Sequence, residues 1–180
     1  MRLPFPALLL ACCLSLLAAC TTPPLATTAH GTTFVVVRHA EKASDTERDP
    51  DLSRAGRERA RRLAGALAGA DIVAVYTTDY RRTRQTVQPA AEAGHVGATI
   101  YDARQPADAF AARLRAAHPR GTVLVAGHSN TVPDIVAALC ACRVEPMPET
   151  EYDRLSTIRI DADGRARLQV TRYGAPPDPP

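Results

Sequence analysis

The sequence predicts an α/β fold: a three-layer sandwich with a mostly parallel central sheet, helices on both faces and a C-terminal antiparallel hairpin. Two observations lead to this prediction. Short apolar runs alternate with stretches of helical periodicity from residue 33 onward, as expected for a parallel sheet covered on both faces. The last two apolar runs instead follow each other directly around Asp163-Gly164, a dipeptide typical of hairpin turns.

The expected strands are short runs rich in β-branched residues, and they cover residues 32–38, 71–78, 98–103, 121–127, 152–161 and 165–173. The expected helices have apolar residues at helical spacing, and they cover residues 52–69, 80–94, 106–119 and 130–142. Ser53 is the expected N-cap of the first helix. Pro89 should kink or divide the second helix, because proline has no amide hydrogen to donate.

The first 20 residues differ in character from the rest of the chain. After Arg2 they form an apolar stretch without charge, which is typical of a secretory signal and too short for a secure membrane span. The stretch ends in Leu17-Ala18-Ala19-Cys20, which resembles the lipobox of bacterial lipoproteins. This resemblance implies lipidation of Cys20; an ordinary cleaved signal or an uncleaved anchor is the alternative.

The chain therefore divides into four parts with different expected roles. These are a lipoprotein-type signal peptide at 1–20, a flexible Thr/Pro/Ala tether at 21–32, one folded domain at 33–173 and a disordered Pro-rich tail at 174–180. A lipid on Cys20 would place the domain in the bacterial cell envelope, on the periplasmic face of the outer membrane, because Thr21 is not the aspartate associated with inner-membrane retention.

Charge and cysteine content exclude some classes of protein. The formal net charge is only +3, which does not indicate a nucleic-acid partner.

Besides Cys20, the predicted mature chain has only Cys140 and Cys142. Residues two apart on a helix point to opposite sides, so a disulfide between them would require the helix to end there. We expect two small unbonded residues in the core or at a helix end, with the disulfide as the alternative.

Polar residues follow the four expected parallel strands, at the edge of the sheet where ligands bind in such folds. Arg38, His39 and Glu41 follow the first strand, and Arg82 lies one helical turn after the second. The third strand ends at Asp102, and the fourth is followed by a turn that contains His128 and Asn130. Imidazoles and guanidiniums that converge on one point suit a dianionic phosphoryl group, because arginine forks bind phosphate oxygens bidentately. A neutral imidazole can also attack phosphorus.

Four motifs carry a family resemblance: "VVVRHAEK", "DLSRAGRERARRLA", "VYTTDYRRTRQT" and "VLVAGHSNT". Together they resemble the histidine phosphatase superfamily, whose fold is phosphoglycerate-mutase-like. Ala40 stands in the glycine position of its Arg-His-Gly signature, as in the compact phosphohistidine-phosphatase-like branch. The resemblance implies that His39 is the nucleophile, that Arg38 and Arg82 bind phosphate, and that His128 donates to phosphoryl oxygens. We add Asn130 to the expected phosphate ligands.

The segment after the third strand departs from the mutases of this superfamily. Those enzymes carry an insertion there with an acidic proton donor, whereas this chain has only "YDARQPADAF". Asp102 is the first candidate for the general acid and Glu41 the alternative. The short segment argues against mutase activity and for a compact phosphatase.

The expected function is a phosphatase that hydrolyses a phosphomonoester or phosphohistidine through a covalent intermediate on His39. A non-catalytic lipoprotein that binds phosphate or a phospholigand on the same fold is the alternative. The partner is then a small phosphorylated substrate or a phosphoprotein. No cofactor is expected. Although "HAE" matches the start of a zinc-deaminase signature, no Pro-Cys-x-x-Cys follows it, so no metal is expected either.

Overall fold

The computed structural model describes residues 31–176, which form one six-stranded sheet in the order β3-β2-β4-β1-β5-β6. The strands are β1 (Thr32–Arg38), β2 (Ile72–Thr77), β3 (Ala98–Ile100), β4 (Gly121–Gly127), β5 (Arg154–Ile160) and β6 (Ala166–Arg172). The helices are α1 (Arg54–Ala66), α2 (Arg81–Ala93), α3 (Ala107–Ala117) and α4 (Val132–Cys140). Strands β1 to β4 pair in parallel, while β5 and β6 form the antiparallel hairpin. The predicted fold class is confirmed.

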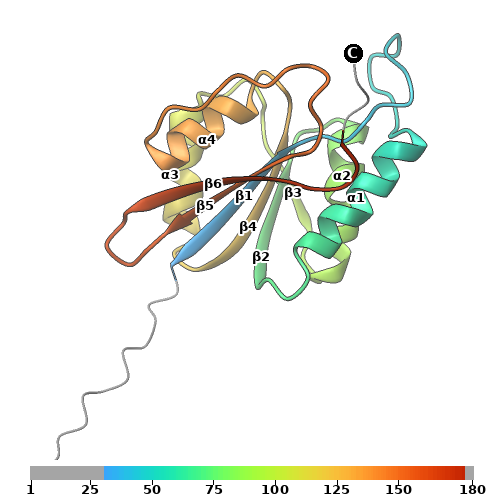
Figure 1. Ribbon diagram of the computed structural model, residues 1–180. Helices are drawn as coiled ribbons and strands as arrows, with labels where there is room; N and C mark the ends of the chain where they lie inside the picture. Colours follow the sequence, from blue (N-terminus) through green and yellow to red (C-terminus); the bar gives the residue numbers. More distant parts are fainter. Residues whose placement is uncertain (1–30, 177–180) are drawn as a thin grey trace, which may run out of the picture.

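The sheet separates two hydrophobic cores, as expected for three layers. Side chains alternate along a strand, so β1 sends Phe34 and Val36 to one face and Val35 and Val37 to the other. Residues of α3 and α4 complete the first core, and residues of α1 and α2 complete the second. Figure 1 shows these two pairs of helices on opposite faces of the sheet. This double burial explains why the run 34–37 is continuously apolar.

Helix α1 begins where the sequence predicts and lies very close to the segment that follows β1. Ser53 is its N-cap, with the hydroxyl accepting from the Gly56 amide at 3.0 Å. A Cβ atom on Gly56 would lie only 2.3 Å from the Glu41 carbonyl oxygen. The absence of a side chain at this position therefore allows α1 to dock against the start of the site.

Helix α2 runs without division from Arg81 to Ala93 with Pro89 inside it. Pro89 therefore does not divide this helix, which was one of the two outcomes expected of it. Val87, Ala90 and Ala91 are buried against the second core, so tertiary packing keeps the two halves of the helix together despite the missing amide hydrogen.

Cys140 and Cys142 form a disulfide, so the expectation of two unbonded residues is wrong. Helix α4 ends at Cys140, and Ala141 adopts a left-handed conformation with a φ of 51°. This turn reverses the backbone and brings the two Cα atoms to 5.1 Å, within disulfide reach. The condition stated from the sequence, that the helix must end there, is met.

The predicted signal peptide and lipidated Cys20 lie outside the described residues, as does nearly all of the tether. Strand β1 begins at Thr32, one residue before the predicted start of the domain. At the other end, the Ala175 carbonyl accepts from Arg59 Nη2 at 2.8 Å, so the first part of the predicted tail contacts α1. Within residues 31–176, none of the helices has the length and apolar character needed to cross a bilayer.

Candidate active site

The carboxyl ends of β1 and β4 place the two predicted histidines side by side. In the parallel pairing of these strands Arg38 lies opposite Gly127, so the residues that follow leave the sheet at the same edge. The His39 amide donates to the Gly127 carbonyl at 2.9 Å. The ring centroids of His39 and His128 are 5.4 Å apart in an edge-to-face arrangement. The two histidines therefore converge as their positions after the strands suggest.

His39 is a buried, neutral imidazole with a defined free nitrogen. Its Nδ1 lies 2.8 Å from the Ala40 carbonyl oxygen. A carbonyl only accepts, so Nδ1 carries the hydrogen and the lone pair of the neutral ring is on Nε2. Burial, together with the positive charge of Arg38, lowers the pKa of His39 to about 3. His39 is thus a nucleophile that needs no prior deprotonation at neutral pH.

A pair of buried threonine hydroxyls holds His128. Its Nε2 lies 3.0 Å from Thr78 Oγ1, which lies 2.8 Å from Thr83 Oγ1. The Thr83 hydroxyl donates to the Tyr80 carbonyl at 2.8 Å, so it accepts from Thr78. Thr78 must then accept from His128, and Nε2 carries the hydrogen. Burial, with Arg82 and Arg38, lowers the pKa of His128 to about 4, so this ring is also neutral at neutral pH.

Arg82 enters the site from the first turn of α2. Its guanidinium carbon lies 4.2 Å from the centre of the Tyr80 ring, over which it stacks. The Arg82 carbonyl accepts from Thr86 Oγ1 at 2.7 Å, and that hydroxyl accepts from the Ala40 amide at 2.9 Å. The motif "RTRQT" therefore does two things: Arg82 supplies a cation, and Thr86 ties α2 to the backbone beside His39.

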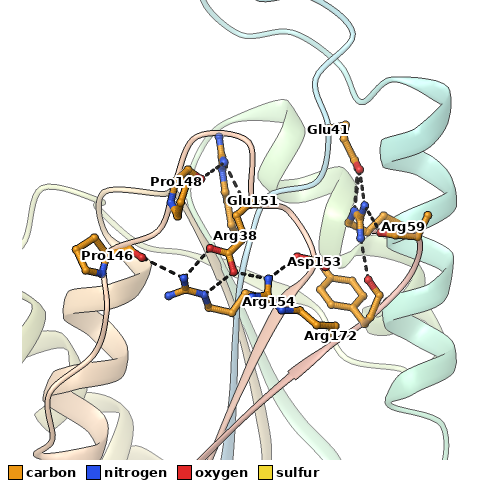
Figure 2. A network of polar contacts seen from close by, with 11 residues as sticks. Arg38, Glu41, Arg59, Pro146, Pro148, Glu151, Asp153, Arg154 and Arg172 are labelled. Atoms are coloured by element: carbon orange, nitrogen blue, oxygen red, sulfur yellow. Dashed lines mark hydrogen bonds and ion pairs between the residues drawn. The ribbon is translucent and has the colours of Figure 1, made fainter. Parts of the chain in front are cut away.

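The Arg38 guanidinium holds a segment that is distant in the sequence. Its Nη1 donates to the carbonyls of Pro148, Glu149 and Glu151 at 3.2, 2.6 and 3.2 Å, which holds the segment that precedes β5. Figure 2 shows this guanidinium directed at Pro148, near the ion pairs that Glu151 makes with Arg154 and Arg172. The Nε of Arg38 is buried and has no hydrogen-bond partner among residues 31–176.

The converging groups line a pocket of about 430 Å³. Five of the predicted residues lie in its wall: Arg38, His39, Arg82, His128 and Asn130. The Nε of Arg82 is buried and also lacks a partner among the described residues. Two guanidinium cations in the same pocket wall as a neutral imidazole form a receptor for an anion with several oxygens.

Glu41 does not line this pocket. Its carboxylate binds Arg59, with contacts of 2.9 and 3.0 Å to Nε and 2.6 Å to Nη2. Arg59 also donates to the carbonyls of Tyr173 and Ala175. Glu41 therefore joins helix α1 and the C-terminal segment to the end of β1, and the geometry gives it no position beside a phosphoryl group.

Asp102 does not line the pocket either. Its carboxylate is largely exposed and binds Arg104, with oxygen–nitrogen distances of 3.2 and 3.3 Å. The side-chain hydrogen bond from Arg104 lowers the pKa of Asp102, so the group is ionised at neutral pH. The structure thus does not bring either sequence-based candidate for the general acid next to His39.

The sequence reasoning missed Glu149 and Tyr152. Glu149 lines the pocket, and its carboxylate accepts from Arg38 Nη2 at 2.6 Å and from Ser129 Oγ. The Tyr152 ring lies 4.2 Å from the Arg38 guanidinium carbon. Both precede β5, which is antiparallel to β1, so its first residue lies at the same edge as the ends of the parallel strands. The predicted hairpin could have pointed to these residues, because the segment that precedes an antiparallel strand also lies at the edge where the parallel strands end.

No group of three or more metal-ligating side chains occurs within residues 31–176. The pocket wall is rich in cations instead, with Lys42, Arg48 and Arg104 in addition to Arg38 and Arg82. Such a field attracts anions and repels metal ions.

The comparisons with known proteins agree with this geometry. The family model of the histidine phosphatase superfamily (branch 1) matches residues 34–96, which contain the first two motifs and the arginine motif of α2. No curated protein matches the chain in sequence.

Solved structures share the fold over nearly their whole length. The protein histidine phosphatase SixA complexed with tungstate is 21% identical, with a TM-score of 0.64, and the match covers 78% of this chain and 96% of that one. A mycobacterial glucosyl-3-phosphoglycerate phosphatase is 16% identical, with a TM-score of 0.62 and coverage of 79% and 99%. A phosphoglycerate mutase from Bacillus anthracis is 14% identical, with a TM-score of 0.60 and coverage of 80% and 94%.

The fold and the site define the class: a phosphoglycerate-mutase-like α/β domain with an arginine- and histidine-lined anion pocket. The match to the family model bears out the predicted resemblance to the histidine phosphatase superfamily, and the solved structures share its fold.

Proposed function

We propose that the protein is a phosphatase that hydrolyses a phosphomonoester or a phosphohistidine through a covalent phosphohistidine on His39. One observation carries the proposal. A neutral imidazole with its lone pair on Nε2 stands in the same pocket as two arginine guanidiniums. A phosphoryl group supplies the negatively charged oxygens that guanidiniums bind.

In the first step, His39 Nε2 attacks phosphorus, the bond from phosphorus to the leaving group breaks, and the leaving group takes up a proton. The phosphorylated ring becomes a cation, and the Ala40 carbonyl that holds the Nδ1 hydrogen stabilises it. Arg38 and Arg82 stabilise the negative charge on the phosphoryl oxygens. In the second step, water attacks phosphorus, gives up a proton, and the phosphorus–nitrogen bond breaks to release inorganic phosphate.

The test is hydrolysis of para-nitrophenyl phosphate by the full chain purified in detergent. We expect His39→Ala to abolish turnover, and an alkaline denaturing quench of wild type should trap a phosphoryl group on His39 that later acid treatment removes. His95→Asn is the matched control, because His95 is exposed and lies outside the pocket. Wild-type hydrolysis no faster than that of His39→Ala would exclude the enzyme. Phosphate binding without turnover would then favour the alternative of a phosphate-binding lipoprotein.

We also propose that a lipid on Cys20 anchors the domain to the periplasmic face of the outer membrane; the lipobox-like sequence supports this. Cys20→Ser should move the protein from the membrane to the soluble fraction after cell fractionation. Retention of the variant in the membrane fraction would contradict the lipid anchor.

A further inference from the structure

The segment that carries Glu149 is held in place by Arg38, and the exposed Glu149 side chain makes its hydrogen bonds at the pocket wall. Arg38 Nη1 donates to three carbonyls of this segment, including that of Glu149 itself. The side chain then reaches Arg38 Nη2 and Ser129 Oγ. Glu149 is therefore the carboxylate fixed beside the phosphate receptor, in contrast to Glu41 and Asp102.

A bound phosphoryl dianion competes with Glu149 for the same guanidinium. Nη1 of Arg38 is bound to backbone carbonyls, and Glu149 already occupies Nη2. A dianion bound at Arg38 brings two negative charges next to the Glu149 carboxylate. Two anionic groups that share one site favour uptake of a proton between them.

We propose that Glu149 is the acid–base residue of this site, which takes up a proton when a dianionic phosphoryl group binds and gives it to the leaving group. This inference rests on the proposed phosphatase function. In the first step the Glu149 proton moves to the leaving oxygen, or nitrogen in a phosphohistidine, as its bond to phosphorus breaks. In the second step the Glu149 carboxylate accepts a proton from the attacking water as the bond from phosphorus to His39 breaks.

The other titratable groups around Glu149 fit this role less well. His39 is the nucleophile and its Nδ1 hydrogen is bound by Ala40. His128 competes for the proton, but Arg82 and Arg38 oppose its protonation, and its Nε2 hydrogen is already shared with Thr78. The cations Lys42, Arg48, Arg82 and Arg104 face the pocket, as does the carboxylate of Glu47. In the empty pocket, hydrogen bonding from Ser129 and the charges of Arg38 and Lys42 keep the pKa of Glu149 low.

Proton uptake is the first test, and it does not require turnover. Tungstate is a tetrahedral dianion that keeps its charge across the neutral range, so the protons taken up belong to the protein. Titration calorimetry of the full chain in buffers of different ionisation enthalpy should give about one proton per tungstate for wild type. Glu149→Gln should take up almost none and bind tungstate about tenfold more tightly, because the repulsion is removed. Uptake that persists in Glu149→Gln but disappears in His128→Asn would overturn the proposal.

The second test separates proton transfer from binding. A general acid matters most for poor leaving groups, so Glu149→Gln should lose about 100- to 10,000-fold in kcat/KM on an alkyl phosphate. On para-nitrophenyl phosphate, whose leaving group needs little protonation, the loss should be small. Glu145→Gln is the matched control, because it makes the same charge change in the same segment but lies exposed and outside the pocket.

The experiments distinguish a failure of the phosphatase function from a failure of the role assigned to Glu149. If wild type hydrolyses neither substrate, the proposed phosphatase function fails. If wild type hydrolyses both, and Glu149→Gln slows both by the same factor, only the assignment of Glu149 fails.

Discussion

At the scale of single residues, hydrogen-bond partners determine which nitrogen of each histidine carries the proton. Ala40 offers His39 only an acceptor, which leaves Nε2 of His39 free. Thr78 becomes an acceptor for His128 only because Thr83 is itself committed to the Tyr80 carbonyl. The two rings are therefore neutral but not equivalent, and each partner belongs to the site as much as the histidine does.

Thr78→Val should disturb His128 without removing it. The change keeps the shape of the side chain and deletes the acceptor of the Nε2 hydrogen, so that the ring loses its fixed tautomer. We expect kcat/KM to fall by about tenfold, the value of one hydrogen bond in this setting. The nitrogen-15 NMR signals of His128 should change toward a mixture of tautomers.

Thr78→Ser should restore both the activity and the NMR signals, because it returns the hydroxyl. Thr77→Val is the control: it also removes a buried hydroxyl, but that group contacts only the Thr78 carbonyl. An unchanged His128 spectrum in Thr78→Val would show that the threonine pair does not set the tautomer.

At the scale of elements, the edge of the sheet that holds the site is built from strands of both directions. Strands β1, β2 and β4 arrive at this edge with their carboxyl ends, whereas β5 starts from it. The segment before β5 therefore closes the pocket on the side of Arg38, and it carries Glu149 and Tyr152. An antiparallel strand beside β1 thus supplies residues that a purely parallel sheet would take from another strand end.

Helix α1 is the element whose position depends most on a single residue. Gly56→Ala would set a Cβ against the Glu41 carbonyl, a backbone atom that cannot rotate away, and would force α1 outward. We expect a loss of about 1–3 kcal/mol in the free energy of unfolding, measured by urea denaturation, with a parallel loss of activity.

Gly65→Ala is the matched control within the same helix. A Cβ at Gly65 would have nothing within 4 Å, so the better helix propensity of alanine should act alone. The variant should gain about 0.5–1 kcal/mol in the free energy of unfolding. Equal effects of the two substitutions would contradict close docking of α1 at Gly56.

At the scale of the whole molecule, the buried histidines make the free energy of unfolding depend on pH. The pKa values of His39 and His128 lie at about 3 and about 4 in the folded protein, against 6.5 in an unfolded chain. Between these values the unfolded chain binds more protons. The unfolding free energy should therefore be constant above neutral pH and decrease as the pH falls below 6.5.

Each histidine should contribute up to about 1.4 kcal/mol per pH unit in this window. His118 should add to the same trend, because burial lowers its pKa as well. Urea titrations at a series of pH values measure the slope, and His39→Asn combined with His128→Asn should reduce it. A slope that the double variant leaves unchanged would contradict the burial of neutral rings.

The sequence by itself was enough for the fold class, because the alternation of apolar runs and helical periodicity reflects the two faces of one sheet. It was also enough to bring Arg38, His39, Arg82 and His128 together, because residues that follow parallel strands share an edge. Both inferences depend on patterns among residues that are close together in the sequence, so they can be made without the tertiary structure.

Only the tertiary structure determined which side chains from distant segments of the chain contact one another at the site. It showed that Glu41 is bound by Arg59 and that Asp102 is bound by Arg104 at the surface. It also placed Glu149 against Arg38, a residue 111 positions away in the chain. The distinction between a carboxylate in the pocket and one beside it depends on angstrom-scale contacts between elements, and no periodicity in the sequence encodes those contacts.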